Sequence, residues 1–258
     1  MVGNYHAKLE NVEMVAAKRN FIKSQNVEVI LYEEFWTSQL TVLEAVVICN
    51  NTDEINSILK ALHSQFALKQ LGQVSLFLGI QVLRNGANFF LNQSHYASKL
   101  LRDSGFEHCK AASTPLAPSH KLTPDLTPFS DPYLYRRLAG SLQYLSITQP
   151  DIAYATNRVC QQMQHPTVQD FQSLKRLLCY IKGTLSFGLP IHTGPLQLQN
   201  YTDADWASDA QDRKSISGYC TFLGPNLITW TVKKQVTVAK SSTEAEYRAL
   251  SAATSEAI

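Results

Sequence analysis

The chain of 258 residues is 45% hydrophobic and 17% charged, which is an ordinary composition for a water-soluble protein of one or two domains. Its formal net charge of +2 is compatible with a nucleic-acid partner but does not by itself indicate one. No apolar stretch reaches the length of a membrane span, and the N-terminus lacks the apolar core of a secretory signal. We therefore expect a soluble intracellular protein, with no compartment assigned.

The five cysteines are scattered, odd in number and free of the CxxC spacing of zinc sites. They are Cys49, Cys109, Cys160, Cys179 and Cys220. This pattern predicts free thiols in a reducing compartment rather than a disulfide framework. His108 and Cys109 are the only His/Cys neighbours, and we interpret them as ordinary residues rather than metal ligands.

The first block, residues 1–45, carries no motif that points to a function. A weak periodicity over residues 12–35 is compatible with a short helix. An apolar strand at residues 46–49 follows, and polar residues then offer N-caps to a helix whose apolar positions continue at helical spacing to Phe66. We expect this segment to stop at Gly72.

The second block, residues 46–106, also contains the clearest local signal of the chain, a β-hairpin. Asn85-Gly86 lies between two β-prone runs. The pair predicts a type I′ turn, because both of its central residues must tolerate a positive φ. A helix over residues 94–103, ended by Gly105, completes a small α+β unit.

The third block, residues 107–195, combines a linker with three helices. Residues 107–130 are rich in Pro, Ser and Thr, which is typical of a linker or an extended strap. Apolar residues at helical spacing then predict three consecutive helices over residues 131–183. Their expected start signals are Asp131 for the first, Pro150 for the second, and the pair Thr167 and Asp170 for the third.

Three basic residues of the third helix, Lys175, Arg176 and Lys182, fall outside its apolar stripe. Residues of this kind can follow a phosphate backbone. A solvated basic face is the simpler interpretation, and the sequence alone leaves both open.

The fourth block, residues 196–258, predicts three antiparallel strands followed by one helix. Alternating residues lead into Asp203, and two further β-rich runs are separated by the turn signal Gly224-Pro225-Asn226. The last helix opens where Thr243 and Glu246 have the spacing of a capping box.

Asp203 and Glu244 are the candidate metal ligands and catalytic residues. One lies at the end of an expected strand and the other at the start of an expected helix, an arrangement that presents carboxylate oxygens to Mg²⁺ for phosphodiester hydrolysis. The neighbouring acids have simpler interpretations, since Asp205 can cap the turn after the strand and Glu246 can cap the helix. An Asp-x-Asp pair also occurs in sugar-nucleotide transferases, but the βαβ unit that such enzymes need is missing here.

Several short phrases, in their order and spacing, resemble the Pol polyprotein of copia-type LTR retrotransposons. The resemblance runs from about Val46 to the end of the chain, and it extends to truncated Pol fragments of plant organellar genomes. The phrases include Phe77-Leu78-Gly79-Ile80, Ser113-Thr114-Pro115-Leu116, Gly140-Ser141-Leu142-Gln143-Tyr144-Leu145, Tyr180-Ile181-Lys182-Gly183-Thr184, Asp203-Ala204-Asp205-Trp206-Ala207 and Ser242-Thr243-Glu244-Ala245-Glu246-Tyr247.

The resemblance implies an α+β fold in four parts. Residues 1–45 stay unassigned, residues 46–106 are a remnant of a reverse-transcriptase palm, and residues 107–195 are a linker and a helical thumb or connection. Residues 196–258 are an incomplete ribonuclease H-like α/β domain of three antiparallel strands and one helix. The implied partner is an RNA/DNA hybrid or another nucleic acid, with no membrane and no small-molecule substrate. In the family, Asp203 would bridge two Mg²⁺ ions and Glu244 would bind one of them.

Departures from the family pattern argue against activity. The positions of the polymerase's Tyr-Val-Asp-Asp turn hold Val42, Leu43, Glu44 and Ala45, and one glutamate beside an alanine cannot hold two Mg²⁺ ions. The third and fourth acids of ribonuclease H are not encoded, two carboxylates bind Mg²⁺ weakly, and the strand of Asp203 is expected to be an unpaired edge.

We therefore expect a degenerate reverse transcriptase/ribonuclease H fragment that is catalytically silent by itself. One alternative is a non-catalytic RNA/DNA-binding or protein-interaction module built on the three helices. Another is an incomplete gene model of a longer, active element.

Overall fold

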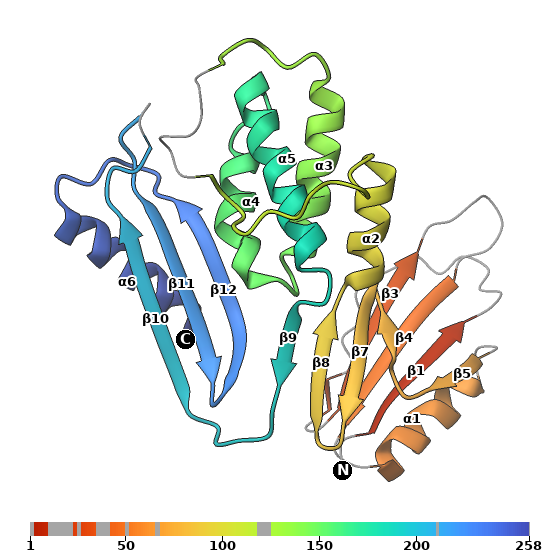
Figure 1. Cartoon of the computed structure of the whole chain (residues 1–258). Helices are drawn as coiled ribbons and strands as arrows, with labels where there is room; N and C mark the ends of the chain where they lie inside the picture. The colour runs from red at the N-terminus through yellow and green to blue at the C-terminus, as the bar shows by residue number, and fades with distance from the viewer. Residues whose placement is uncertain are drawn as a thin grey trace. The chain divides into compact units, whose positions relative to one another are not determined.

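The computed structural model divides the chain into two compact units, Met1–Phe77 and Leu78–Ile258 (Figure 1). The residues that it describes are 3–9, 23–24, 27–34, 42–49, 52–64, 68–117, 125–209 and 212–257. Helices and strands are both present, and the strand pairings that can be described residue by residue are antiparallel, so the α+β fold class is confirmed. The boundaries of the four blocks stay predictions.

The first unit is built on a five-stranded sheet with the order β2-β3-β4-β1-β5. Its strands are β1 Gly3–Leu9, β2 Lys23–Ser24, β3 Val27–Glu34, β4 Val42–Cys49 and β5 Leu68–Gly72. Helix α1, Thr52–His63, contacts β4 and β1 and buries Ile55 and Leu59, which are four residues apart on one helical face. The short β6, Leu76–Phe77, ends the unit.

Two expectations for this unit were wrong. The described residues within 12–35 form β2 and β3 rather than a helix, because β3 pairs with β4 from Val27 to Glu34 and its backbone groups find their partners there. The helix after β4 ends at His63, and Gly72 ends β5 instead of a helix. Phe66 lies outside the described residues.

In the second unit, β7 Ile80–Asn85, β8 Asn88–Asn92 and β9 Gly188–Ile191 lie side by side in one sheet. The predicted hairpin is confirmed, but its turn is shifted by one residue, since Asn85 pairs with Asn88 across Gly86-Ala87. Gly86 has a φ of +61°, whereas Ala87 does not adopt a positive φ. A glycine followed by such a residue is typical of a type II′ turn, so the type I′ prediction was wrong.

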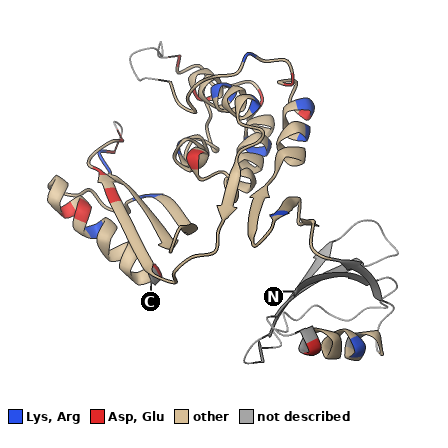
Figure 2. Ribbon diagram, turned by 60° about the horizontal axis from the view of Figure 1, so that its bottom comes forward, with Lys and Arg blue, Asp and Glu red and all other residues tan. Residues whose placement is uncertain are grey.

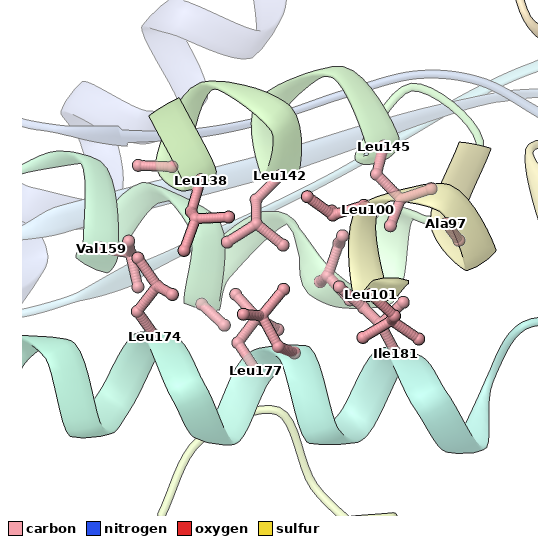
Figure 3. Close-up of a cluster of buried hydrophobic side chains, with 14 of the residues drawn as sticks. Ala97, Leu100, Leu101, Leu138, Leu142, Leu145, Val159, Leu174, Leu177 and Ile181 are labelled. Atoms are coloured by element: carbon pink, nitrogen blue, oxygen red, sulfur yellow. The ribbon is translucent and has the colours of Figure 1, made fainter. Parts of the chain in front are cut away.

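Four helices of the second unit form a block whose core is apolar. They are α2 Ser94–Asp103, α3 Pro132–Leu145, α4 Ala153–Cys160, preceded by the 3₁₀ turn Pro150–Ile152, and α5 Val168–Gly183. The predicted caps are confirmed at Asp131, whose side chain accepts from Leu134 N, and at the capping box of Thr167 and Asp170. Figure 3 shows Leu142, Leu177 and Ile181 among side chains from these helices that point toward one another.

The C-terminal part has the three strands and the helix that the sequence predicts. They are β10 Leu198–Asp205, β11 Ile216–Leu223, β12 Asn226–Lys234 and α6 Ser242–Ala257. The sheet order β10-β11-β12 leaves β10 at an edge among the described strands, as expected. Helix α6 packs on this sheet through Ala204, Ala245 and Ala249.

No helix within the described part of the chain is both long and apolar enough to cross a bilayer.

The packing of α5 generates the first prediction. Leu178 is fully buried in the helical core, whereas Leu126 is 73% exposed. Leu178→Ala is expected to lower the free energy of unfolding by about 2–5 kcal/mol, because the lost contacts leave a cavity. Leu126→Ala is the matched control and should change it by less than about 0.5 kcal/mol. Urea unfolding measures both, and equal effects of the two variants would contradict this account of the core.

Candidate functional site

Asp203 lies on the edge strand β10, on the face of the sheet turned away from α6. The next residue, Ala204, is buried against α6, and successive side chains of a strand point to opposite faces. Asp203 is exposed and borders a largely apolar depression of about 420 Å³ that Tyr154 and Trp230 also line. Its carboxylate is therefore accessible from the face that carries α4.

Asp205 lies on the same face and is near α4. The hydroxyl of Tyr154 donates to its Oδ2 at 3.5 Å, a long and therefore weak hydrogen bond. In the turn after β10, the backbone N–H of Ala207 donates to Oγ of Ser215 at 3.1 Å, and Ala207 has a φ of +51°. Ser215 thus stabilises the turn for which Asp205 was the suggested cap.

Glu244 lies in the first turn of α6, where its carboxylate and its backbone are both hydrogen-bonded. Its Oε2 accepts a hydrogen bond from the backbone N–H of Lys240 at 2.7 Å, and its own N–H donates to Oγ of Ser241 at 3.1 Å. The capping-box prediction for Thr243 and Glu246 was therefore wrong. The helix begins at Ser242, which places Ser241 at the cap and Glu244 three residues after it.

The second oxygen of Glu244 is also engaged. Oε1 pairs with Nη2 of Arg248 at 2.6 Å, one helical turn further along. Nη1 of Arg248 donates to the carbonyl oxygen of Thr237 at 2.9 Å, so the guanidinium is fixed from two sides. The hydrogen bond from Lys240 and the pairing with Arg248 lower the pKa of Glu244, against a smaller opposing effect of burial.

The described contacts include no hydrogen bond or ion pair between Asp203 and Glu244. No group of three or more His, Cys, Asp or Glu side chains with the geometry of a metal site occurs among the described residues. In this conformation both oxygens of Glu244 accept from protein donors, so Mg²⁺ ligation would have to displace Lys240 or Arg248. The assignment of Asp203 and Glu244 as metal ligands stays a prediction.

One charged cluster near the site was not expected from the sequence. Nζ of Lys234 lies 2.6 Å from Oδ2 of Asp209 and 2.9 Å from Oδ2 of Asp212. These ion pairs tie the end of β12 to the loop that follows β10. The partners are more than twenty residues apart in the printed sequence, and no local pattern marks such a pair.

The positions that correspond to the polymerase turn lie in a strand. Residues 42–45 form the first half of β4, which pairs with β3 on one side and β1 on the other. Glu44, for example, is opposite Tyr32 of β3 and Lys8 of β1. The backbone here is part of the sheet interior, not of an exposed turn.

Two of the basic residues of α5 contact the segment that follows α2. The ammonium group of Lys175 lies 5.8 Å from the ring centroid of Phe106, within cation–π range. Nη2 of Arg176 donates to Oγ1 of Thr114 at 2.8 Å. These side chains therefore hold part of the chain in place, which is more than the solvated face that the sequence suggested.

The polar cap of α6 generates the second prediction. Because the pKa of Glu244 is lowered below its ordinary value of 4.5, its carboxylate stabilises the folded chain above that pH, and the contribution is lost as the pH falls through the lowered value. Wild type should melt at a higher temperature than Glu244→Gln at pH 7, and the difference should shrink toward pH 3. Glu246→Gln, on an exposed position of the same helix, is the control and should not show this difference. A pH-independent difference for Glu244→Gln would contradict the role of the charge.

Several known proteins resemble this chain, among them polyproteins of retrotransposons. Residues 8–118 match the family model of reverse transcriptase (RNA-dependent DNA polymerase). An uncharacterized mitochondrial protein of Arabidopsis thaliana, AtMg00810, is 45% identical over 78% of this chain and 85% of its own length. The retrovirus-related Pol polyproteins from transposons RE1 and RE2 of the same plant are 36% and 42% identical over 98% and 80% of this chain. The chain spans 17% and 14% of those two polyproteins. It therefore belongs to the reverse-transcriptase family of copia-type retrotransposon Pol polyproteins.

Proposed function

We propose that this chain, taken by itself, is a catalytically silent derivative of a reverse transcriptase and ribonuclease H polyprotein. The observation that carries the proposal is that neither candidate centre offers two adjacent carboxylates free of protein partners. The polymerase positions contain one acid, Glu44, and the ribonuclease H candidate Glu244 is engaged by Lys240 and Arg248.

For DNA synthesis, the polymerase positions of this chain have too few carboxylates to bind two Mg²⁺ ions. Two Mg²⁺ ions must be held close together to align the attacking hydroxyl with the leaving phosphate. Ala45 supplies no ligand, and the β4 backbone at Glu44 and Ala45 is paired on both sides. Restoring a metal-binding turn there would require this part of the central strand to leave the sheet.

For hybrid cleavage, a Mg²⁺ ion would have to compete with protein donors for the carboxylate of Glu244. A Mg²⁺ ion dehydrates reluctantly and needs several oxygen ligands in octahedral order. At Glu244 it would replace a charge-assisted hydrogen bond and an ion pair, leaving the Lys240 N–H and the Arg248 guanidinium without this acceptor. Asp203, whose carboxylate makes no hydrogen bond or ion pair among the described residues, would remain beside Asp205, which accepts only the weak hydrogen bond from Tyr154.

The third prediction tests this proposal directly. The purified chain, shown to be folded by circular dichroism, is incubated with a labelled RNA/DNA hybrid and Mg²⁺ or Mn²⁺. We expect no cleavage above that of Asp203→Asn, because Asp203 without the carboxylate of Glu244 does not hold the metal pair. Cleavage by wild type that Asp203→Asn abolishes would refute the proposal. In that event Glu244→Gln and Glu246→Gln, tested side by side, would show which glutamate belongs to the active site.

A second candidate function is binding of an RNA/DNA hybrid by the helical block without chemistry. The observation in its favour is the set of Lys and Arg positions on these helices (Figure 2), among which Lys175 is exposed. Cationic side chains of this kind release counterions from a nucleic acid, and binding through them weakens as salt rises. The contacts of Arg176 with Thr114 limit how far this side chain can turn to a phosphate.

The fourth prediction tests whether the helical block binds an RNA/DNA hybrid. If the helical block binds the hybrid, the double variant Lys175→Ala with Arg176→Ala should weaken binding and reduce the slope of log K against log salt by roughly two, one for each lost phosphate contact. Lys233→Ala with Lys240→Ala removes the same charge outside the block and is the matched control. Fluorescence anisotropy at several salt concentrations measures both, and an absence of binding at low salt would exclude this function.

A further inference from the structure

The segment that follows α2 is held along one face of α5. We call residues 106–114 the strap. The backbone N–H of Ala112 donates to the carbonyl oxygen of Cys179 at 3.1 Å, and a Cβ added at Gly183 would meet the Cβ of Ala111 at 3.2 Å. Together with the contacts of Lys175 and Arg176 described above, these define a close and extended interface.

The α5 residues of this interface are spaced for one helical face. Cys179 follows Lys175 by four residues and Arg176 by three, and Gly183 follows Cys179 by four, so these positions lie on one side of the helix. Cys179 is the middle member of this face, and Cys109 lies in the strap opposite it. Cys109 is close enough to Cys179 to act on the pKa of its thiol, and both thiols are free and partly buried.

Seventy positions separate these cysteines in the printed sequence, so no spacing rule brings them together. Their proximity follows from the strap contacts on either side, at Phe106 and at Ala112 to Thr114. Disulfide formation needs two cysteines on backbone segments that lie close together. The 3.1 Å hydrogen bond from Ala112, three residues after Cys109, to the carbonyl oxygen of Cys179 holds the strap against this part of α5.

We propose that Cys109 and Cys179 are a thiol-modification site that forms a reversible intrachain disulfide with a small disulfide such as oxidised glutathione, locking the strap on α5. One protein thiolate attacks a sulfur of the reagent, which forms a mixed disulfide and releases one glutathione thiolate. The second protein thiolate then attacks the mixed disulfide and releases the second glutathione. In total, the two protein thiols lose two protons and two electrons, and oxidised glutathione gains two protons and two electrons.

The environment of Cys179 makes this exchange slow at neutral pH. Burial and the neighbouring Cys109 raise the pKa of Cys179 to about 11, while Lys175 and Arg176 act in the opposite direction. Both cysteines must lose a proton in the two attacks, whichever reacts first. The rate of closure should therefore rise with pH above neutrality, since only the thiolate attacks.

The fifth prediction tests the pair with the full chain. After incubation with oxidised glutathione at pH 9, the chain should lose two of its five titratable thiols. Peptide mapping under non-reducing conditions should find Cys109 linked to Cys179. Cys109→Ser and Cys179→Ser should each retain glutathione on the remaining cysteine as a mixed disulfide, because no second thiol resolves it. Cys220→Ser, which changes a cysteine of β11, is the matched control and should close like wild type.

Several outcomes would overturn the proposal. They are retention of all thiols at pH 9, cross-links between chains in place of the intrachain bond, and closure that persists in Cys109→Ser. A second measurement tests the locking itself. Limited proteolysis of the strap should slow in the oxidised chain and recover on reduction, and an oxidised chain cut as fast as the reduced one would show that the disulfide does not hold the strap.

Discussion

The buried apolar face of α5 is the constraint on which the helical block depends. Leu174, Leu177, Leu178 and Ile181 are all fully buried, and each such side chain contributes about 1.5–3 kcal/mol when it leaves water. Helices α2 and α4 contact α5 directly, while α3 joins the same core. The opposite face of α5 holds the strap, so one helix organises both the core and the irregular segment around it.

The carboxylate of Glu244 cannot stabilise the N-terminus of α6 and bind a metal ion at the same time. At the N-terminus of α6, Glu244 satisfies a backbone donor and balances Arg248, and a negative charge at this end of a helix is also favoured by the helix dipole. On the proposal above, the polar groups that would serve chemistry in the polyprotein family serve local stability in this chain.

The sequence predicted best where the signal is local. The caps at Asp131 and Thr167 and the order of strands after residue 196 follow from neighbouring residues alone. The turn at Gly86 was displaced by one residue, because β8 also pairs with β9, about a hundred positions away, and that pairing shares in setting the register. At α6, Ser241 and Thr243 are both good cap residues, and the packing of Ala245 and Ala249 on the sheet selects between them. The pairing of Asp209 with Lys234 and the proposed pairing of Cys109 with Cys179 have no local signature at all.

Helix α6 contacts its sheet through small alanine side chains, and this weak apolar contact favours local unfolding of the helix. Ala204, Ala245 and Ala249 allow the helix to approach closely but bury little apolar area. Attachment of α6 thus depends strongly on the polar contacts at its first turn, and segments with few apolar contacts open at low free-energy cost. In native-state hydrogen exchange, the amides of α6 should lose protection together and well before those of α5, as a separate cooperative unit.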